Sequence, residues 1–145
     1  MRSAKIVLQL ALFVFSIKFA NAQKYELTLN VTAVRNVSGQ VLVTIYKSDK
    51  GFPDDHTHAI YFKNVTIKGN KMRVDVGDLS PGKYAVVAVH DENNNARLDA
   101  NIVGYPIEGI AVSDGIKSKL RKPKFAESAF TLSASTTVEL KMNYY

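Results

Sequence analysis

Apolar and polar residues alternate from Tyr25 to Ala33, where every second side chain is apolar. This period is typical of a β-strand that buries one face. No window of the chain has a sustained helical period. We therefore predict an all-β fold, a single antiparallel β-sandwich of about seven short strands joined by turns. The further predicted strands are Val41 to Tyr46, Ile60 to Ile67, Met72 to Val76, Tyr84 to His90, Phe130 to Leu132 and Thr136 to Met142.

Turn-forming residues separate these segments. Lys68-Gly69-Asn70 fits a tight β-hairpin between two of the predicted strands. A Ser-Pro-Gly turn leads into Tyr84 to His90, a segment that is apolar on both faces. A strand of that kind lies in the middle of a sheet, so we expect it at the centre of the core. A long irregular loop follows it, up to Lys124.

Residues 1–22 have the features of a cleavable signal peptide. Two basic residues precede an apolar run from Ile6 to Ile17, and Ala20-Asn21-Ala22 is the small-x-small pattern that precedes cleavage. The run holds about a dozen residues, fewer than the roughly 20 that a membrane-spanning helix needs. The chain also has no cysteine to carry a lipid. We expect an exported protein, periplasmic or extracellular and not lipid-anchored, whose mature domain is residues 23–145 without a transmembrane segment.

Charge and composition narrow the range of functions. The leader holds three of the 19 basic residues and none of the 13 acidic ones, so the net charge falls from +6 to 16 minus 13, or +3. The absence of cysteine excludes disulfides, thiol catalysis and thiolate metal sites. No aromatic residue lies among the clustered cations, so we interpret their segment as a solvated loop and expect no nucleic-acid binding. These cations are Lys117, Lys119, Arg121, Lys122 and Lys124.

The most polar stretch of the chain carries a candidate metal site. Calcium binds six to eight oxygen ligands, and a tight loop with an oxygen-bearing side chain at every second residue can wrap the ion. Arg97 stands at position 7 of such an EF-hand-like loop, where the backbone carbonyl is the ligand. The side-chain candidates, at positions 1, 3, 5 and 9, are Asp91, Asn93, Asn95 and Asp99.

Two positions of this loop depart from the EF-hand pattern. Position 6 is Ala96 where the pattern uses glycine, and position 12 is Ile102 where it uses glutamate. Two interpretations therefore stay open. One is a weak calcium site, with Glu108 or Asp114 completing the ligand shell. The other is a turn that Asx side chains hold by their own hydrogen bonds, with no ion.

The same part of the chain carries motifs of a known family. H-D-E-N-N-N-A-R-L-D-A-N, G-Y-P-I-E-G and K-P-K-F-A-E-S-A-F follow L-S-P-G-K-Y-A-V. Their joint order, over about residues 25–145, resembles family 2141 of domains of unknown function, which are bacterial exported proteins. The family usually has glycine where this chain has Asn94 and Ala96. The resemblance implies the fold and export, and no biochemical activity. L-S-P-G-K-Y is also similar to the turn-to-strand signature of transthyretin-like and collagen-adhesin B-type sandwiches, which are mostly binding or spacer modules.

Two functional hypotheses follow. The first is an exported, non-catalytic binding or accessory module, which binds a partner protein, a glycan or a small ligand through the loops between Asp91 and Lys124. The second is a small envelope hydrolase or other enzyme that uses His90 with a nearby carboxylate. A buried pocket joining His90 to Asp99 or Glu108 would favour the enzyme, and a shallow loop surface would favour the binding module. We assign no catalytic and no cofactor-binding residue.

Overall fold

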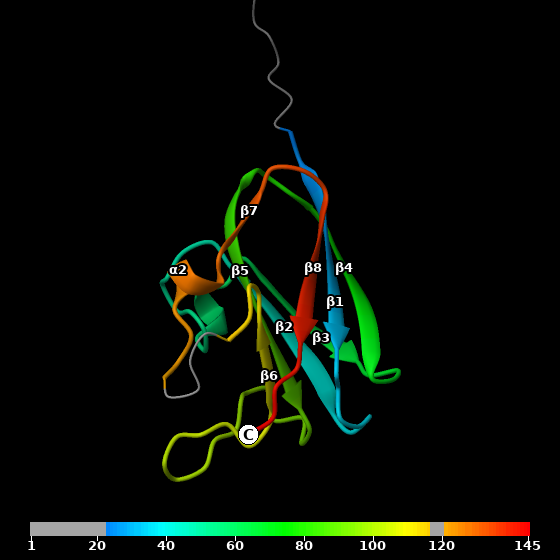
Figure 1. Ribbon diagram of the computed structural model, residues 1–145, viewed down its shortest axis with the longest axis vertical. Coiled ribbons are helices and arrows are strands. Elements are labelled where there is room, and N and C mark those ends of the chain that lie inside the picture. Colours follow the sequence, from blue (N-terminus) through cyan, green and yellow to red (C-terminus); the bar gives the residue numbers. More distant parts are fainter. Residues whose placement is uncertain (1–22, 117–120) are drawn as a thin grey trace, which may run out of the picture.

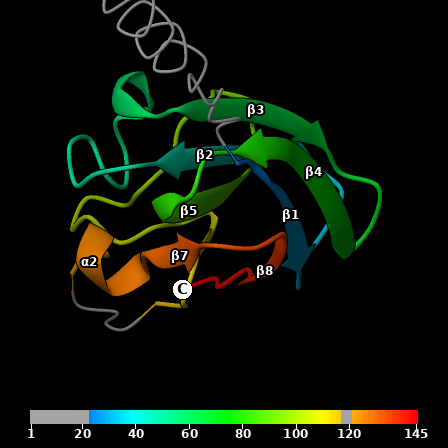
Figure 2. The same ribbon diagram turned by 90° about the horizontal axis from the view of Figure 1, so that it is seen from above.

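Residues 23–116 and 121–145 are described by the computed structural model. The expected signal peptide, residues 1–22, lies outside the described residues, as do Lys117 and Lys119 of the basic cluster. The described chain forms two β-sheets that pack face to face (Figures 1 and 2). The predicted all-β sandwich is therefore confirmed, with eight strands instead of about seven.

The strands account for most of the regular structure. They are β1 (Tyr25–Thr32), β2 (Gln40–Tyr46), β3 (Tyr61–Thr66), β4 (Lys71–Leu79), β5 (Gly82–Asp91), β6 (Gly109–Val112), β7 (Phe130–Leu132) and β8 (Thr136–Lys141). A 3₁₀ turn, η1 (His56–His58), and a short helix, α2 (Phe125–Ser128), lie in the connections. No helix within these described ranges is long and apolar enough to cross a membrane.

The two sheets differ in size and in strand direction. One has three strands in the order β4-β1-β8, and the other has the order β3-β2-β5-β6, with β7 paired to the first residues of β5. β1 and β8 run parallel, with Leu27 opposite Thr136, while the other strand pairs are antiparallel. The three-stranded sheet is therefore mixed, which corrects the prediction of a purely antiparallel sandwich. The period of a single strand carries no information on the direction of its neighbour.

The predicted hairpin at Lys68-Gly69-Asn70 is wrong. β3 pairs with β2 in one sheet and β4 pairs with β1 in the other, so this turn carries the chain across the sandwich. Ile67, 8% exposed, packs into the core at the crossing. The residues of the turn specify a change of direction, whereas the buried apolar face of each strand decides which partner it pairs with.

β6 was missed because it lies in the segment that we predicted as irregular. Its four residues, Gly109–Val112, are all buried and pair with β5. Four apolar residues are too few to show a period, so the pattern alone cannot separate a short buried strand from a buried loop. β6 extends the larger sheet beside the central strand.

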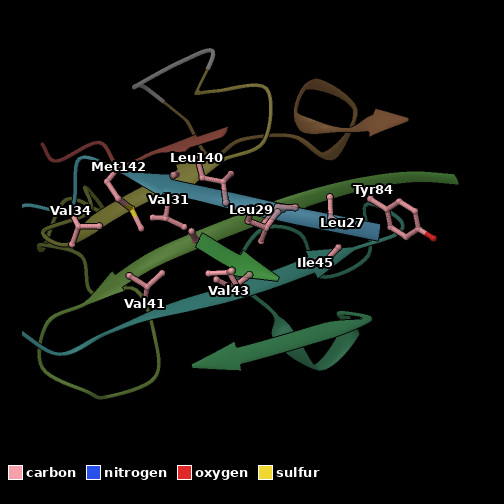
Figure 3. Packing of buried hydrophobic residues seen from close by; sticks show 14 of the residues in the cluster. Leu27, Leu29, Val31, Val34, Val41, Val43, Ile45, Tyr84, Leu140 and Met142 are labelled. Carbon is pink, nitrogen blue, oxygen red and sulfur yellow. The ribbon is translucent and has the colours of Figure 1, made fainter. Parts of the chain in front are cut away.

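The position of β5 agrees with the prediction of a central strand. Alternate residues face opposite sides: Val86 and Ala88 belong to the core between the sheets, while Val87 and Val89 belong to an apolar cluster on the outer face of the larger sheet. Figure 3 shows the core between the sheets, where side chains of β1 such as Leu29 meet those of β2, with Leu140 and Met142 alongside. A fully buried Val or Leu stabilises the fold by roughly 1.5–3 kcal/mol.

Candidate functional site

Asp91 anchors the loop in which sequence predicts a metal site. Its carboxylate is fully buried at the end of β5. Oδ1 accepts the backbone N–H of Asn95 at 3.0 Å, and Oδ2 accepts that of Ala96 and the side-chain amide of Gln40, both at 2.9 Å. Both oxygens of this first predicted ligand therefore already bind donors of the protein.

The other predicted ligands form a second set of hydrogen bonds. The side-chain oxygens of Asn93 and Asn95 each accept a backbone N–H two residues further on, at 3.1 Å. Their amide groups donate to Oδ2 of Asp99, at 2.6 and 2.8 Å. The amide of Asn95, then that of Asn93, holds the pKa of Asp99 below its usual range. Arg97 contributes the N–H that Asn95 accepts, and its side chain lies in solvent.

The backbone of this loop is left-handed at two residues that are not glycine. Asn94 has a φ of 60° and Ala96 a φ of 63°. Ala96 thus has the positive dihedral that position 6 of an EF-hand loop requires, although it lacks the usual glycine. Alanine in place of glycine at position 96 therefore strains the backbone but does not change the shape of the loop.

Glu108 closes the loop from the opposite side. This buried side chain accepts the N–H of Glu92 at Oε1 and the N–H of Asp99 at Oε2, both at 2.9 Å. Asp114, the other proposed extra ligand, lies in the turn after β6. Within the described ranges, no group of three His, Asp or Glu side chains is placed to hold a metal ion. The hydrogen bonds support the turn interpretation, and calcium binding stays a prediction.

The buried side chain of His90 links three parts of the chain by hydrogen bonds. Its Nε2–H donates to the carbonyl of Ser38 at 2.9 Å, and Nδ1 lies 2.8 Å from the hydroxyl of Tyr144, which accepts the N–H of Arg35 at 3.0 Å. Because a carbonyl can only accept, Nε2 carries the proton in the bond to Ser38. Both nitrogens are occupied, which gives the enzyme hypothesis no free base at His90.

An ion pair between Arg35 and Glu92 lies next to His90. The guanidinium of Arg35 binds both carboxylate oxygens of Glu92, with Nε 2.8 Å from Oε1, and stacks on the ring of Tyr144 at 4.6 Å. The hydrogen bond from Arg35 is the main cause that lowers the pKa of Glu92 to about 2. The β1–β2 connection, the end of β5 and the carboxyl-terminal segment are thereby joined beneath the loop.

A cleft of about 660 Å³ lies on the outer face of the larger sheet. Strand pairing sets Leu42, Val89 and Ile110 in one row across its floor, with Thr44 and Val87 in the next row. Its described walls come from the segments around residues 53–56, 96–106 and 121–123. His90, Asp91, Asp99 and Glu108 are not among the described residues that line it. The cleft therefore does not join His90 to Asp99 or Glu108, which is the arrangement that the enzyme hypothesis needs.

Aromatic rings close one end of this floor. Tyr46 and Phe52 make an edge-to-face contact with centroids 5.4 Å apart, and Phe52 makes another with Phe125 at 5.9 Å. The hydroxyl of Tyr46 donates to the carbonyl of Pro53 at 3.1 Å, and burial raises the pKa of Tyr46 to about 12. These contacts fix the loop after β2 against the sheet, so this end of the cleft is preformed.

Most of the chain matches the sequence model of a known family. A family model described as an uncharacterized protein conserved in bacteria, family 2141 of domains of unknown function, matches residues 29–139. The chain belongs to family 2141. No curated protein and no solved structure matches the chain significantly.

The match to family 2141 runs from within β1 to within β8, so it includes both sheets, the loop and the floor of the cleft. Sequence reasoning did not single out the residues of that floor, because it treated the apolar side chains of β5 as core. The pattern nonetheless held a usable signal. A strand that is apolar on both faces needs a cover on its outer face, and an incomplete cover leaves a cleft.

Proposed function

We propose that this member of family 2141 is an exported, non-catalytic binding module whose ligand site is the cleft on the outer face of the larger sheet. The cleft itself is the observation that carries the proposal. Its volume of about 660 Å³ falls within the roughly 300–1,000 Å³ of small-molecule sites. Its floor is mostly apolar, and the charged groups stand around it, which is the usual composition of such sites.

The floor is a rigid support. It belongs to β2, β5 and β6, which are hydrogen-bonded to one another over their whole overlap. Val87 and Ile110 are only 2% and 5% exposed, so their side chains have little freedom to rearrange. A ligand that binds there meets a surface whose shape is set before binding, which lowers the entropic cost of association.

Apolar residues also stand exposed beside the cleft. Ile102 is fully exposed and Val103 is 72% exposed, at the tip of the loop between β5 and β6. The side chain of Asn101 accepts the N–H groups of Val103 and Tyr105, at 3.1 and 3.0 Å, and so holds this tip in shape. Val103 and Tyr105 line the cleft. An ordered apolar tip at the opening supports binding, because exposed apolar patches commonly mark interaction sites.

A pair of tryptophan substitutions tests the proposal. Thr44→Trp fills the floor of the cleft, whereas Thr137→Trp places the same side chain on the exposed outer face of the smaller sheet. The probes are anilinonaphthalene sulfonate and phenylnaphthylamine, two fluorophores with the same rings. We expect saturable binding to the native protein, weakened about tenfold or more by Thr44→Trp and unchanged by Thr137→Trp. Absence of saturable binding, or binding that Thr44→Trp does not weaken, would contradict the proposal.

A further inference from the structure

We infer that the ligand of this cleft is an amphipathic anion, with an apolar body on the floor and its anionic group at Arg97. This inference rests on the proposed function and adds the chemical class of the ligand. It depends on the length of the floor, on the charges around it, and on how firmly each cation is bound to its present partner.

The floor suits an elongated apolar body. It extends along β2 from Leu42 to Tyr46, which is about 13 Å at roughly 3.3 Å per residue. Thr44 is the polar residue in the middle of this stretch, opposite Val87 of β5 on one side and Phe62 of β3 on the other. Fused aromatic rings or a medium-length alkyl chain match these dimensions.

The charges around the cleft favour an anion. The cationic lining residues within the described ranges are Arg97, Arg121 and Lys122, and the acidic one is Asp54. The other two acids that pair with these cations, Asp99 and Glu127, are not among the described lining residues. Among the described lining residues, cations therefore outnumber acids, and an anionic group that replaces the partner of one cation is attracted to it.

The three cations differ in how firmly they are held. Nη2 of Arg121 binds both oxygens of Glu127, at 2.7 and 2.9 Å, and Nζ of Lys122 binds Asp54. Both stand at the Tyr46 end of the floor, since Pro53 accepts from Tyr46 and Asp54 follows it. An anion there would have to displace a short ion pair.

Arg97 is the cation that its acidic partner holds least firmly. Nε lies 3.3 Å from Oδ1 of Asp99, whose other oxygen accepts two amide groups, and the Arg97 side chain is 75% exposed. An exposed ion pair of this kind contributes little to stability. The planar guanidinium can therefore turn toward a ligand at small cost, and it binds a carboxylate, sulfonate or phosphate through two parallel hydrogen bonds.

The loop gives Arg97 its place at the cleft. It leaves β5 at Asp91, beside the row of Leu42, Val89 and Ile110. The hydrogen bonds to Asp91 and the left-handed backbone at Ala96 fix the chain just before Arg97. The polar loop thus acts on the ligand by positioning one cation opposite the aromatic end of the floor.

The chain offers a matched control for this arginine. Arg73 stands on the outer face of the smaller sheet and pairs through Nε with Asp75, two residues further on, as Arg97 pairs with Asp99. We expect the native protein to bind anilinonaphthalene sulfonate about fivefold more tightly than uncharged phenylnaphthylamine. Arg97→Gln should remove about that factor for the sulfonate and change the uncharged probe less than twofold. Arg73→Gln should change neither probe.

Displacement of the sulfonate probe identifies the source of the anion. Dodecanoate represents a free carboxylate, dodecyl phosphate represents a phosphate head, and dodecanol is the uncharged reference. Displacement by either anion but not by the alcohol supports the inference, and the stronger anion identifies the head group. Equal binding of the two probes, equal displacement by dodecanol, or an unchanged sulfonate affinity in Arg97→Gln would overturn it. If both probes bind equally and Thr44→Trp weakens both, the cleft stands as a site and only the anionic class is wrong.

Discussion

The outer faces of the two sheets differ in polarity: that of the smaller sheet is polar and that of the larger sheet is apolar. On the smaller sheet, the outer face is polar and its side chains bond across strands: Thr28 donates to Asp75 at 3.2 Å, and Asn30 donates to Glu139 at 2.7 Å. On the larger sheet, the corresponding side chains are apolar and belong to a second buried cluster that connecting segments cover. Water can hydrogen-bond to a polar outer face, so such a face needs no further packing. An apolar outer face has to be covered by other segments of the chain, and here the covering segments leave a cleft.

The largest expected difference between the two faces is in stability. Val87→Asn places an amide in the covered face, where neighbouring residues offer it few partners, so we expect the free energy of unfolding to fall by about 3 kcal/mol. Thr137→Asn, on the exposed face, should change it by less than about 1 kcal/mol. Urea denaturation of the two variants measures both values. Equal losses would show that the two outer faces do not differ in the way described.

The loop that borders the cleft offers the next test. Asp91→Asn replaces a buried carboxylate that accepts three hydrogen bonds with an amide that has one accepting oxygen. We expect the free energy of unfolding to fall by about 2 kcal/mol, because backbone donors are left unpaired.

If the loop is a turn without an ion, the melting temperature of the native protein is the same in millimolar calcium and in chelator. A calcium site would instead stabilise by about 2.7 kcal/mol at about 100 times its dissociation constant, which is several degrees.

The ion pair beneath the loop predicts a pH dependence. The pKa of Glu92 is lowered to about 2 in the folded protein, below the value of about 4.3 in an unfolded chain. A lowered carboxyl pKa stabilises the fold above the unfolded value, and that contribution is lost as the pH falls from about 4.3 through about 2. Glu92→Gln should therefore cost about 2 kcal/mol at pH 7 and progressively less toward pH 2. Denaturation curves at several pH values measure this difference, and a constant difference would contradict the assignment.

The smallest expected effect concerns backbone strain in the same loop. Ala96→Gly relieves the left-handed conformation, so we expect the variant to be more stable by about 0.5–1 kcal/mol. Asn94→Gly should gain less, because asparagine tolerates this conformation better. Ala129, with a φ of −79°, is the matched control, and its replacement by glycine should destabilise the fold. Thermal unfolding ranks the three variants, and a loss of stability in Ala96→Gly would contradict the strain argument.

The sequence predicted the strands better than their partners. The alternation in β1 and the two apolar faces of β5 located those strands, because burial acts on each residue in place. The parallel pairing of β1 with β8, and the crossing at Lys68-Gly69-Asn70, depend on contacts between distant segments. β6 was too short to show a period. Local pattern therefore predicted the class of fold and left its topology open.

The candidate site was predicted only in part. The oxygen-rich loop was located, and its Asx side chains bond to their own backbone as one of the two interpretations stated. Arg97 was named for its carbonyl as a metal ligand, whereas the structure places it among the residues that line the cleft. Thr44 was not named, since one threonine among the apolar residues of β2 does not indicate that the covered face holds a cavity.

Amide chemical shifts, recorded as anilinonaphthalene sulfonate is added to the isotopically labelled protein, test the central claim most directly. The account predicts that the shifting residues lie on β2, β5 and β6 and in the loop around Arg97, and that the strands of the smaller sheet do not respond. Shifts concentrated on β1, β4 and β8, or the absence of saturable shifts on the larger sheet, would contradict it.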